Sequence, residues 1–336
     1  MGNININKNL QSGGGKCKYS VITPVFNRSD CIGRCIESVI RNLKKNISIE
    51  HIIVDDGSSD DTVNIIKSYA NKYCHIKFIQ FSSNRGTNAA RNAAISAATG
   101  EFCIILDSDD YFVDDALEKI NSAIQNKEKY GHYLFVPNDR IDYLKQNLLL
   151  KGRNFRVLHF VDFLNNSISG DFIHVIKTAT LKKYPFDEEL RIYEGVFFLK
   201  FYKEAQKIFF VNEIVTIRER NREDSVSKDF LRTSINIINR AIKSQKLWIE
   251  WFEDDCQQLG LQNLVCNKYT SLLENHLLAN DYSSAKADIM HIWSYNGHVP
   301  MYLKLVYYLR CGWIYRSLLK IYLGLKYNFL NQNLES

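Results

Sequence analysis

The chain has 336 residues and a mass of 39.1 kDa, with 46% apolar and 24% charged residues and only 4 prolines. This is the composition of a folded globular protein larger than one average domain, and it excludes mini-proteins, collagen-like chains and disordered chains. The formal net charge of +6 is too small to indicate a partner by itself. The eight cysteines form no CxxC pair, and no charged start precedes an apolar run at the N-terminus. We therefore expect reduced thiols in a cytoplasmic protein without a membrane-spanning helix.

The first half of the chain alternates between strand and helix patterns. Residues 1–18 are polar and glycine-rich, as in a flexible leader. Beyond them, short β-branched runs predict strands over 19–26, 47–54, 76–81 and 101–106. Helical spacing predicts helices after residue 30, over 62–73 and over 88–98. This alternation predicts right-handed βαβ units on a parallel sheet, whose ligands bind beyond the carboxyl ends of the strands.

The second half becomes progressively helical. Residues 111–220 mix the two patterns, with helices expected near 114–127 and 195–206 and strands near 132–137, 172–177 and 208–217. Beyond residue 230 the pattern is helical. The segment 301–330 contains no acidic residue, and its basic residues are Lys304, Arg310, Arg316, Lys320 and Lys326. This basic, aromatic composition is typical of an amphipathic helix on an anionic membrane surface. A helical hairpin packed on the protein, with its basic side chains in solvent, is the alternative.

The acidic run Asp107–Asp110 follows the fourth expected strand. Its three carboxylates repel one another unless a positive charge lies between them, and oxygen ligands favour Mg²⁺ or Mn²⁺ over zinc. The alternative is a loop of helix-capping acids, with Asp110 at the start of the next helix. A second acidic loop, Asp55–Asp60, follows the second strand, and Arg85 and Arg91 supply nearby positive charge for phosphate oxygens. Two acidic loops at one sheet edge favour a nucleotide with its cation.

Five motifs in this region resemble those of family 2 glycosyltransferases in order and spacing. They are Val21–Asn27, Val54–Asp60, Asn84–Asn92, Thr99–Glu101 and Leu106–Asp110. The resemblance covers residues 19–225 and implies an α/β fold of the GT-A type, a Rossmann-type nucleotide-binding sheet flanked by helices, which we place at 19–228. The helical pattern beyond it predicts a helical C-terminal region over 229–336.

The resemblance also implies roles for individual residues of the donor site. Pro24, Phe26 and Asp56 should line the uracil and ribose pocket, with Arg91 near the nucleotide. Asp107 and Ser108 should contact the nucleotide-sugar, and Asp109 and Asp110 should bind Mn²⁺ or Mg²⁺.

The proposed catalytic base, Glu194, comes from a later acidic motif. Inverting transfer needs a carboxylate that takes the proton of the acceptor hydroxyl. Glu194 stands at the family's position for this base, although Tyr193 replaces a frequent second acid; a helix-capping glutamate is the alternative. Further on, Arg220 and Arg222 resemble the segment that closes over the diphosphate in many members, and Arg222 stands where many have histidine. A solvated charge run is the other interpretation.

The sequence therefore predicts an inverting, metal-dependent glycosyltransferase. It would move a hexose or N-acetylhexosamine from a UDP-sugar to a lipid-linked glycan of a bacterial surface polysaccharide, at the inner face of the cell membrane. The alternative hypothesis is a non-catalytic subunit that binds a nucleotide-sugar for another transferase. We expect no nucleic-acid partner, because a distributed positive groove with stacking aromatics is not indicated.

Overall fold

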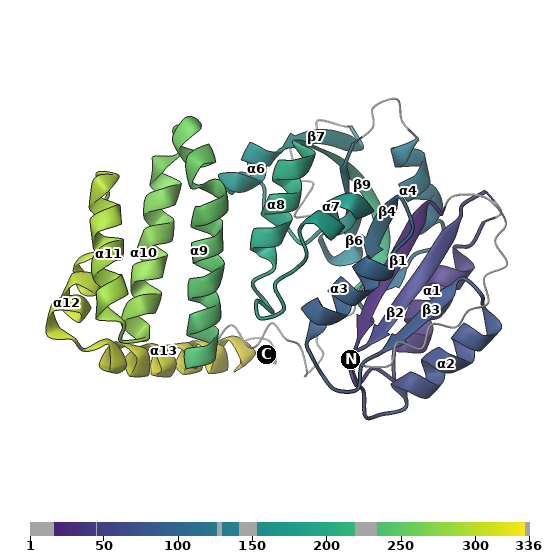
Figure 1. Cartoon of the computed structure of the whole chain (residues 1–336), viewed down its shortest axis with the longest axis horizontal. Coiled ribbons are helices and arrows are strands. Elements are labelled where there is room, and N and C mark those ends of the chain that lie inside the picture. Colours follow the sequence, from purple (N-terminus) through teal and green to yellow (C-terminus); the bar gives the residue numbers. More distant parts are fainter. Residues whose placement is uncertain (1–16, 45, 126–129, 141–152, 219–233, 333–336) are drawn as a thin grey trace. The chain divides into compact units, whose positions relative to one another are not determined.

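The computed structural model describes residues 17–44, 46–125, 130–140, 153–218 and 234–332 (Figure 1). The chain divides into two compact units. The N-terminal unit comprises Met1–Arg191 and Phe197–Arg222, and the C-terminal unit comprises Ile192–Val196 and Glu223–Ser336. The boundary predicted at 228/229 and nearly all of the predicted leader lie outside the described residues.

The four strands predicted first form the parallel half of one sheet. They are β1 (Tyr19–Val25), β2 (Ile49–Asp55), β3 (Ile76–Gln80) and β4 (Phe102–Ile105), in the spatial order β3-β2-β1-β4. The connecting helices are α1 (Ile32–Arg41), α2 (Thr62–Lys72) and α3 (Thr87–Ala97). All seven residues of β1 are buried, as expected for a central strand with helices on both faces. The predicted α/β fold with βαβ units is confirmed.

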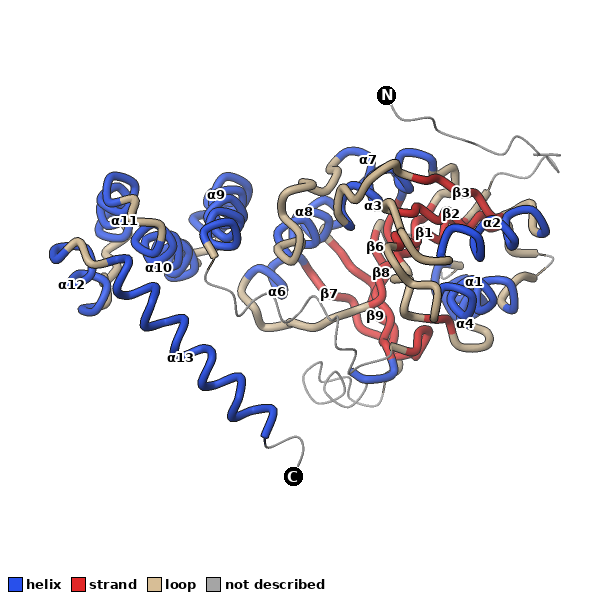
Figure 2. The backbone as a smooth tube through the Cα atoms, turned by 90° about the horizontal axis from the view of Figure 1, so that it is seen from below, coloured by secondary structure: helices blue, strands red, loops and turns tan. Residues whose placement is uncertain are grey.

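The order of these strands creates a switch point between β1 and β4. From β1 the chain adds β2 and then β3 on one side of β1. It then crosses back and adds β4 on the other side of β1. With right-handed crossovers, α1 and α2 cover one face of the sheet and α3 the other; Figure 2 shows this arrangement. Ligands of open α/β sheets bind where the strand order reverses, in the crevice beyond the carboxyl ends of the strands.

Beyond β4 the sheet is mixed. β8 (Ile173–Lys177) pairs antiparallel with β4 and with β6 (His132–Pro137), whereas β9 (Lys207–Ile217) pairs parallel with β6. Two strands that the sequence did not predict, β5 (Tyr111–Phe112) and β7 (Phe155–His159), pair with β9. The other elements among the described residues of this part are α4 (Ala116–Ile124), η1 (Asn138–Arg140), α6 (Phe160–Leu164), α7 (Thr178–Lys183) and α8 (Gly195–Ala205). Because α4 begins at Ala116, the alternative that placed Asp110 at a helix start is wrong.

The C-terminal unit consists of helices, as predicted for the chain beyond residue 230. They are α9 (Ile235–Gln258), α10 (Gln262–Leu278), α11 (Tyr282–Ser294), α12 (Met301–Leu309) and α13 (Gly312–Gln332). Figure 1 shows α9, α10 and α11 side by side, with α10 in the middle. A buried pair, His276 Nδ1 and Asp288 Oδ2 at 2.6 Å, joins α10 to α11. Within the described ranges, no helix is long and apolar enough to cross a membrane.

The predicted amphipathic segment 301–330 forms two helices instead of one. The chain leaves α12 at Arg310, whose φ of 50° lies in the left-handed region. It then enters α13 at Gly312, where the backbone passes so close to α10 that a Cβ would overlap the Leu277 carbonyl oxygen and lie 2.8 Å from Asn280 Oδ1. Only glycine permits this approach.

Replacing Gly312 by alanine should therefore destabilise the C-terminal unit, because the atoms that the added Cβ would meet include fixed backbone. We expect Gly312→Ala to lower the free energy of unfolding by about 1–3 kcal/mol, measured by urea denaturation. Gly324→Ala is the matched control in the same helix, since a Cβ there meets nothing within 4 Å. It should be neutral or stabilise by up to about 1 kcal/mol. Equal changes in the free energy of unfolding for the two substitutions would show that the backbone of α10 does not exclude a Cβ at position 312.

Candidate functional site

The residues predicted to bind the donor lie on loops at the carboxyl ends of β1, β2 and β4. Val25 is paired with Asp55 across β1 and β2, and the amide of Asp56 donates to the Val25 carbonyl oxygen at 2.8 Å. Pro24 belongs to β1, and Phe26 follows it directly. The Phe26 side chain is 40% exposed at this edge, so its ring is accessible to a planar ligand.

Asp56 is nearly fully buried, and it organises the loop after β3. Its two carboxylate oxygens accept hydrogen bonds from the backbone amides of Arg85, at 2.7 Å, and Gly86, at 2.8 Å. Burial raises the pKa of Asp56 above its usual value, although both amide bonds oppose this shift. The adjacent Gly57 has a φ of +78°, and a Cβ there would lie 2.6 Å from the Ser83 carbonyl carbon. The loop therefore requires glycine at position 57. This backbone conformation keeps the Asp56 carboxylate within hydrogen-bonding distance of the Arg85 and Gly86 amides.

Arg91 and Asp107 are brought together across the switch point. Arg91, on α3, has only 13% of its side chain exposed, and one of its terminal nitrogens lies 3.1 Å from Asp107 Oδ1. The guanidinium also lies 5.9 Å from the centre of the Phe186 ring. The Asp107 side chain is 49% exposed, so one of its oxygens is held while the group remains accessible to a ligand.

The loop from Asp107 to Asp110 turns inward after β4. The Asp110 amide donates to the Asp107 carbonyl oxygen at 3.0 Å, and Ser108 and Asp110 are both buried. Burial raises the pKa of Asp110 to about 8, and the charges of Asp107 and Asp109 add to that shift while Arg218 opposes it. The ionised form of Asp110 is therefore disfavoured, mainly because the group is buried and in part because two further carboxylates lie nearby.

Arg218 is the charged partner of this loop that the sequence analysis missed. At the end of β9, its Nε lies 3.5 Å from Asp110 Oδ2, and another of its nitrogens lies 2.6 Å from Asp171 Oδ2. Its backbone amide donates to Asn138 Oδ1 at 2.8 Å. It begins the same basic run as Arg220 and Arg222, and its position as the first residue after a predicted strand was the signal available. Arg220 and Arg222 themselves lie outside the described residues.

The acidic loop has the donor chemistry of a hard divalent cation. Across the described ranges, no three His, Cys, Asp or Glu side chains are arranged as a complete metal site. Mn²⁺ and Mg²⁺ in phosphate-binding proteins usually need only one or two carboxylates, because substrate phosphates supply further ligands. Burial is the largest cause of the raised pKa of Asp110, and the like charges of Asp107 and Asp109 add to it, so a cation beside the loop would stabilise the ionised carboxylates. Asp109 and Asp110 therefore fit the predicted role.

Glu194 is the residue before α8, within the segment Ile192–Val196 that groups with the C-terminal unit. The neighbouring Ile192 has a φ of 71°. The left-handed region is strained for a β-branched residue, and such strain often occurs in functional segments.

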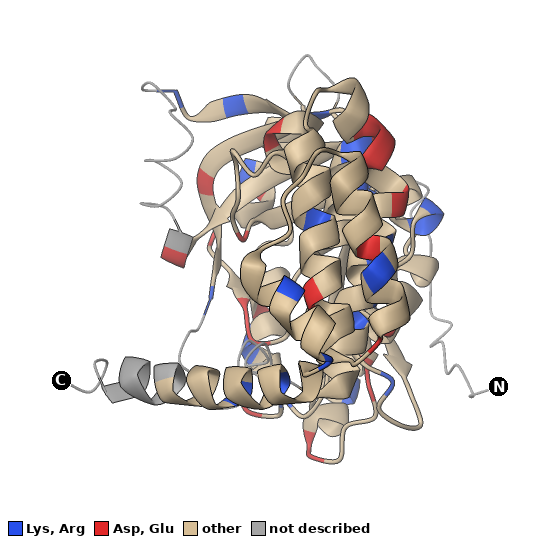
Figure 3. Cartoon of the chain, turned by 90° about the vertical axis from the view of Figure 1, so that its left-hand side faces the viewer, with Lys and Arg blue, Asp and Glu red and all other residues tan. Residues whose placement is uncertain are grey.

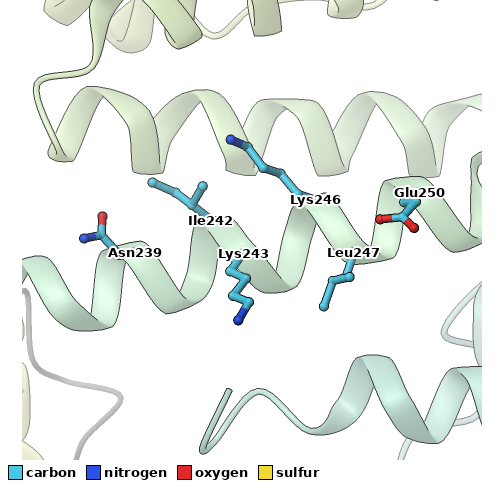
Figure 4. A pocket seen from close by; sticks show the side chains of 6 residues that line it. All are labelled: Asn239, Ile242, Lys243, Lys246, Leu247 and Glu250. Carbon is cyan, nitrogen blue, oxygen red and sulfur yellow. The ribbon is translucent and has the colours of Figure 1, made fainter. Parts of the chain in front are cut away.

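A separate hollow of about 410 Å³ borders α9 in the C-terminal unit (Figure 4). Its lining residues are all on this helix: Asn239, Ile242, Lys243, Lys246, Leu247 and Glu250. None of the described side chains assigned to the donor lines this hollow, so it is distinct from the edge of the sheet.

Residues of the N-terminal unit match a known protein family. The family model described as glycosyl transferase family 2 matches residues 20–183. The GalNAc(5)-diNAcBac-PP-undecaprenol beta-1,3-glucosyltransferase of Campylobacter jejuni is 31% identical over 217 residues, which are 62% of this chain and 67% of the relative.

Two solved structures show the same fold. Residues 1–349 of TarS from S. aureus, in complex with UDP-GlcNAc, match with a TM-score of 0.54 and 18% identity over 84% of this chain and 93% of that chain. The mannosyltransferase PcManGT from Pyrobaculum calidifontis, in complex with GDP-Man and Mn²⁺, matches with a TM-score of 0.53 and 15% identity, over 93% and 87% of the two chains.

The raised pKa of Asp110 predicts a pH-dependent stability. Because its folded pKa of about 8 exceeds the usual 3.8, the stability that this group contributes is complete below pH 3.8 and is lost as the pH rises through 8. Asp110→Asn cannot ionise, so in metal-free buffer it should become progressively more stable than wild type from pH 5 to pH 8, by about 1–3 kcal/mol at the upper end. Thermal melting at several pH values measures this. A stability difference that stays constant or shrinks with rising pH would contradict the assignment.

Proposed function

The chain belongs to glycosyl transferase family 2, and on that premise we propose that it transfers a hexose or N-acetylhexosamine from a UDP-sugar to a lipid-linked glycan, with inversion and with a divalent cation. That it is a glycosyltransferase with a GT-A-like fold follows from the family and the structural likeness. The observation that carries the finer proposal is the gathering of Asp56, Arg91 and Asp107 at the β1/β4 switch point.

The donor would bind along this edge of the sheet. The exposed Phe26 ring and the adjacent Pro24 offer an apolar surface for the uracil base. Asp56 already uses one lone pair on each oxygen for a backbone amide, and the remaining lone pairs can accept base N–H or ribose hydroxyl groups. Arg91 holds Asp107 in position, and Ser108 lies beside it in the same turn. The proposal of UDP is supported by the TarS complex with UDP-GlcNAc.

Asp109 and Asp110 are the residues that would hold Mn²⁺ or Mg²⁺. When bound, the cation would neutralise charge on the departing diphosphate. The chain's own contribution is to present the two carboxylates and to hold Asp110 beside Arg218 until the cation and donor arrive. Arg220 and Arg222 are proposed to place further positive charge at the diphosphate. The PcManGT complex, which contains Mn²⁺, supports the metal dependence.

Glu194 is the proposed catalytic base. Its carboxylate would accept the proton of the acceptor hydroxyl while that oxygen forms a bond to the anomeric carbon and the bond from that carbon to the diphosphate breaks. Attack from the face opposite the leaving UDP inverts the configuration. The carboxylate would then release the proton to solvent after product departure.

The proposed acceptor is a glycan on a lipid carrier, in the synthesis of a bacterial surface polysaccharide. The Campylobacter jejuni relative is named for an undecaprenol diphosphate-linked glycan. A lipid-linked acceptor would place the reaction at a membrane surface, which we propose is the cytoplasmic face.

The decisive test is the release of UDP from a panel of UDP-sugars with Mn²⁺, comparing wild type, Asp109→Ala and Glu194→Gln. Wild type should hydrolyse one donor slowly without acceptor, and chelation of the metal should stop the reaction. Asp109→Ala should lose this activity. With membrane lipid extract as the source of acceptor, Glu194→Gln should lower transfer by about 10²–10⁴-fold and leave UDP affinity unchanged.

Glu204→Gln is the matched control, because Glu204 is an accessible carboxylate on α8 that pairs with Lys183. It should retain wild-type activity. Unchanged transfer by Glu194→Gln would remove Glu194 from the mechanism, and UDP binding without turnover under all conditions would favour a non-catalytic subunit.

A further inference from the structure

The last two helices expose an apolar surface that the rest of the described chain does not show. On α13 the exposed large apolar side chains recur at helical spacing, on one face: Ile314, Leu318, Ile321, Tyr322 and Leu325. On α12 the same spacing exposes Met301, Leu305, Tyr308 and Leu309. We call these residues the α12–α13 surface. Leu305, Leu318 and Ile321 are 53%, 60% and 60% exposed, so these side chains contribute little to the core of their own unit.

The exposure is concentrated in this part of the chain. Elsewhere among the described residues, exposed large apolar side chains are fewer. Met290 and Trp293 lie on α11, and the others occur singly: Phe26, Leu43, Phe155, Ile235 and Leu259. Isolated exposed apolar residues are ordinary on a protein surface, whereas a continuous series along successive helices marks an interaction site.

The inner side of α13 is fixed to the C-terminal unit. Its first residue, Gly312, packs against the end of α10, and its amide donates to the Tyr282 hydroxyl at 3.0 Å. One turn later the Tyr315 hydroxyl donates to Glu274 Oε1 on α10. Leu319 and Leu323 are less exposed than their neighbours and continue this inner side. These contacts fix the orientation of α13 on the C-terminal unit. The same face of the helix therefore stays exposed.

The charges of this region have one sign. No Asp or Glu occurs between Asp288 and Glu335, whereas Lys304, Arg316 and Lys320 lie within the two helices and Arg310 lies between them. Figure 3 shows basic residues and no acidic residue on the ribbon of α13. Tyr308, Trp313 and Tyr322 are also well exposed, and such aromatic side chains are favoured at membrane interfaces because each has an apolar ring and a polar atom.

We propose that the α12–α13 surface docks on an anionic lipid bilayer, with the exposed apolar face of α13 inserted among the acyl chains and the basic side chains at the headgroups. Arg316 and Lys320 lie in the middle of α13, and this charge placement suits a helix that lies in the interface. A second copy of the chain fits the surface poorly, since two such surfaces would bring like charges together without acidic partners. Anionic headgroups supply the missing opposite charge. The inference depends on this surface alone and not on the proposed glycosyl transfer.

Co-sedimentation of the full chain with vesicles tests the docking surface in the absence of donor and acceptor. Wild type should bind vesicles that contain about one third phosphatidylglycerol at least about tenfold more tightly than vesicles of phosphatidylcholine alone, and added salt should weaken this binding. The double variant Leu318→Glu, Ile321→Glu should lose at least about tenfold in affinity. The double variant Ile235→Glu, Leu259→Glu is the matched control, because it adds the same two charges at an exposed isoleucine and an exposed leucine of the same unit, and it should bind as wild type does.

Circular dichroism and thermal melting of each variant establish that folding is retained, which the exposure of both substituted side chains predicts. Equal vesicle binding by the double variant and by wild type would overturn the proposal, as would equal binding to neutral and anionic vesicles. Self-association that the double variant abolishes, without vesicle binding by wild type, would instead identify a second copy of the chain as the occupant. Because no donor is present, none of these outcomes depends on whether the chain transfers sugar.

Discussion

Repulsion among carboxylates at the carboxyl ends of parallel strands is the constraint around which the N-terminal unit is arranged. The order β3-β2-β1-β4 brings the loops after β1, β2 and β4 to one edge, and each acidic side chain there has a different counterpart. Asp56 is met by two backbone amides, Asp107 by Arg91, and Asp110 by Arg218. The two amides lie 2.7 and 2.8 Å from the Asp56 oxygens, and Arg91 lies 3.1 Å from Asp107 Oδ1. Arg218 Nε lies 3.5 Å from Asp110 Oδ2, so the negative charge is least compensated at Asp110.

This uneven compensation is suited to a ligand that carries its own cation. A fully neutralised loop would gain little from Mn²⁺, and a loop without any counterpart would destabilise the fold. Arg218 compensates the charge of Asp110 only in part. It also pairs with Asp171, so it can remain anchored if a cation takes its place beside Asp110. The proposed nucleotide-sugar binding and the stability of the sheet edge would therefore be linked through the same few charges.

Local patterns in the sequence were sufficient for β1 to β4 and α1 to α3, because β-branched runs and helical spacing alternate there with clear turn residues. They did not predict β5 and β7, which are short and form only by pairing with β9, far away in the sequence. Asp56, Arg91 and Asp107 were placed at one edge correctly, since the topology requires it. Arg218 was missed because its partners come from other segments, and the break between α12 and α13 depends on a contact between Gly312 and Leu277 that composition does not reveal.

A crystal structure of the full chain with UDP and Mn²⁺, with anomalous scattering measured at the manganese edge, tests the central claim most directly. The account predicts UDP at the β1/β4 switch point, its base beside Phe26 and Asp56, and one anomalous peak between the diphosphate and the carboxylates of Asp109 or Asp110. UDP bound elsewhere, or a manganese peak that no carboxylate of the Asp107–Asp110 loop contacts, would contradict it.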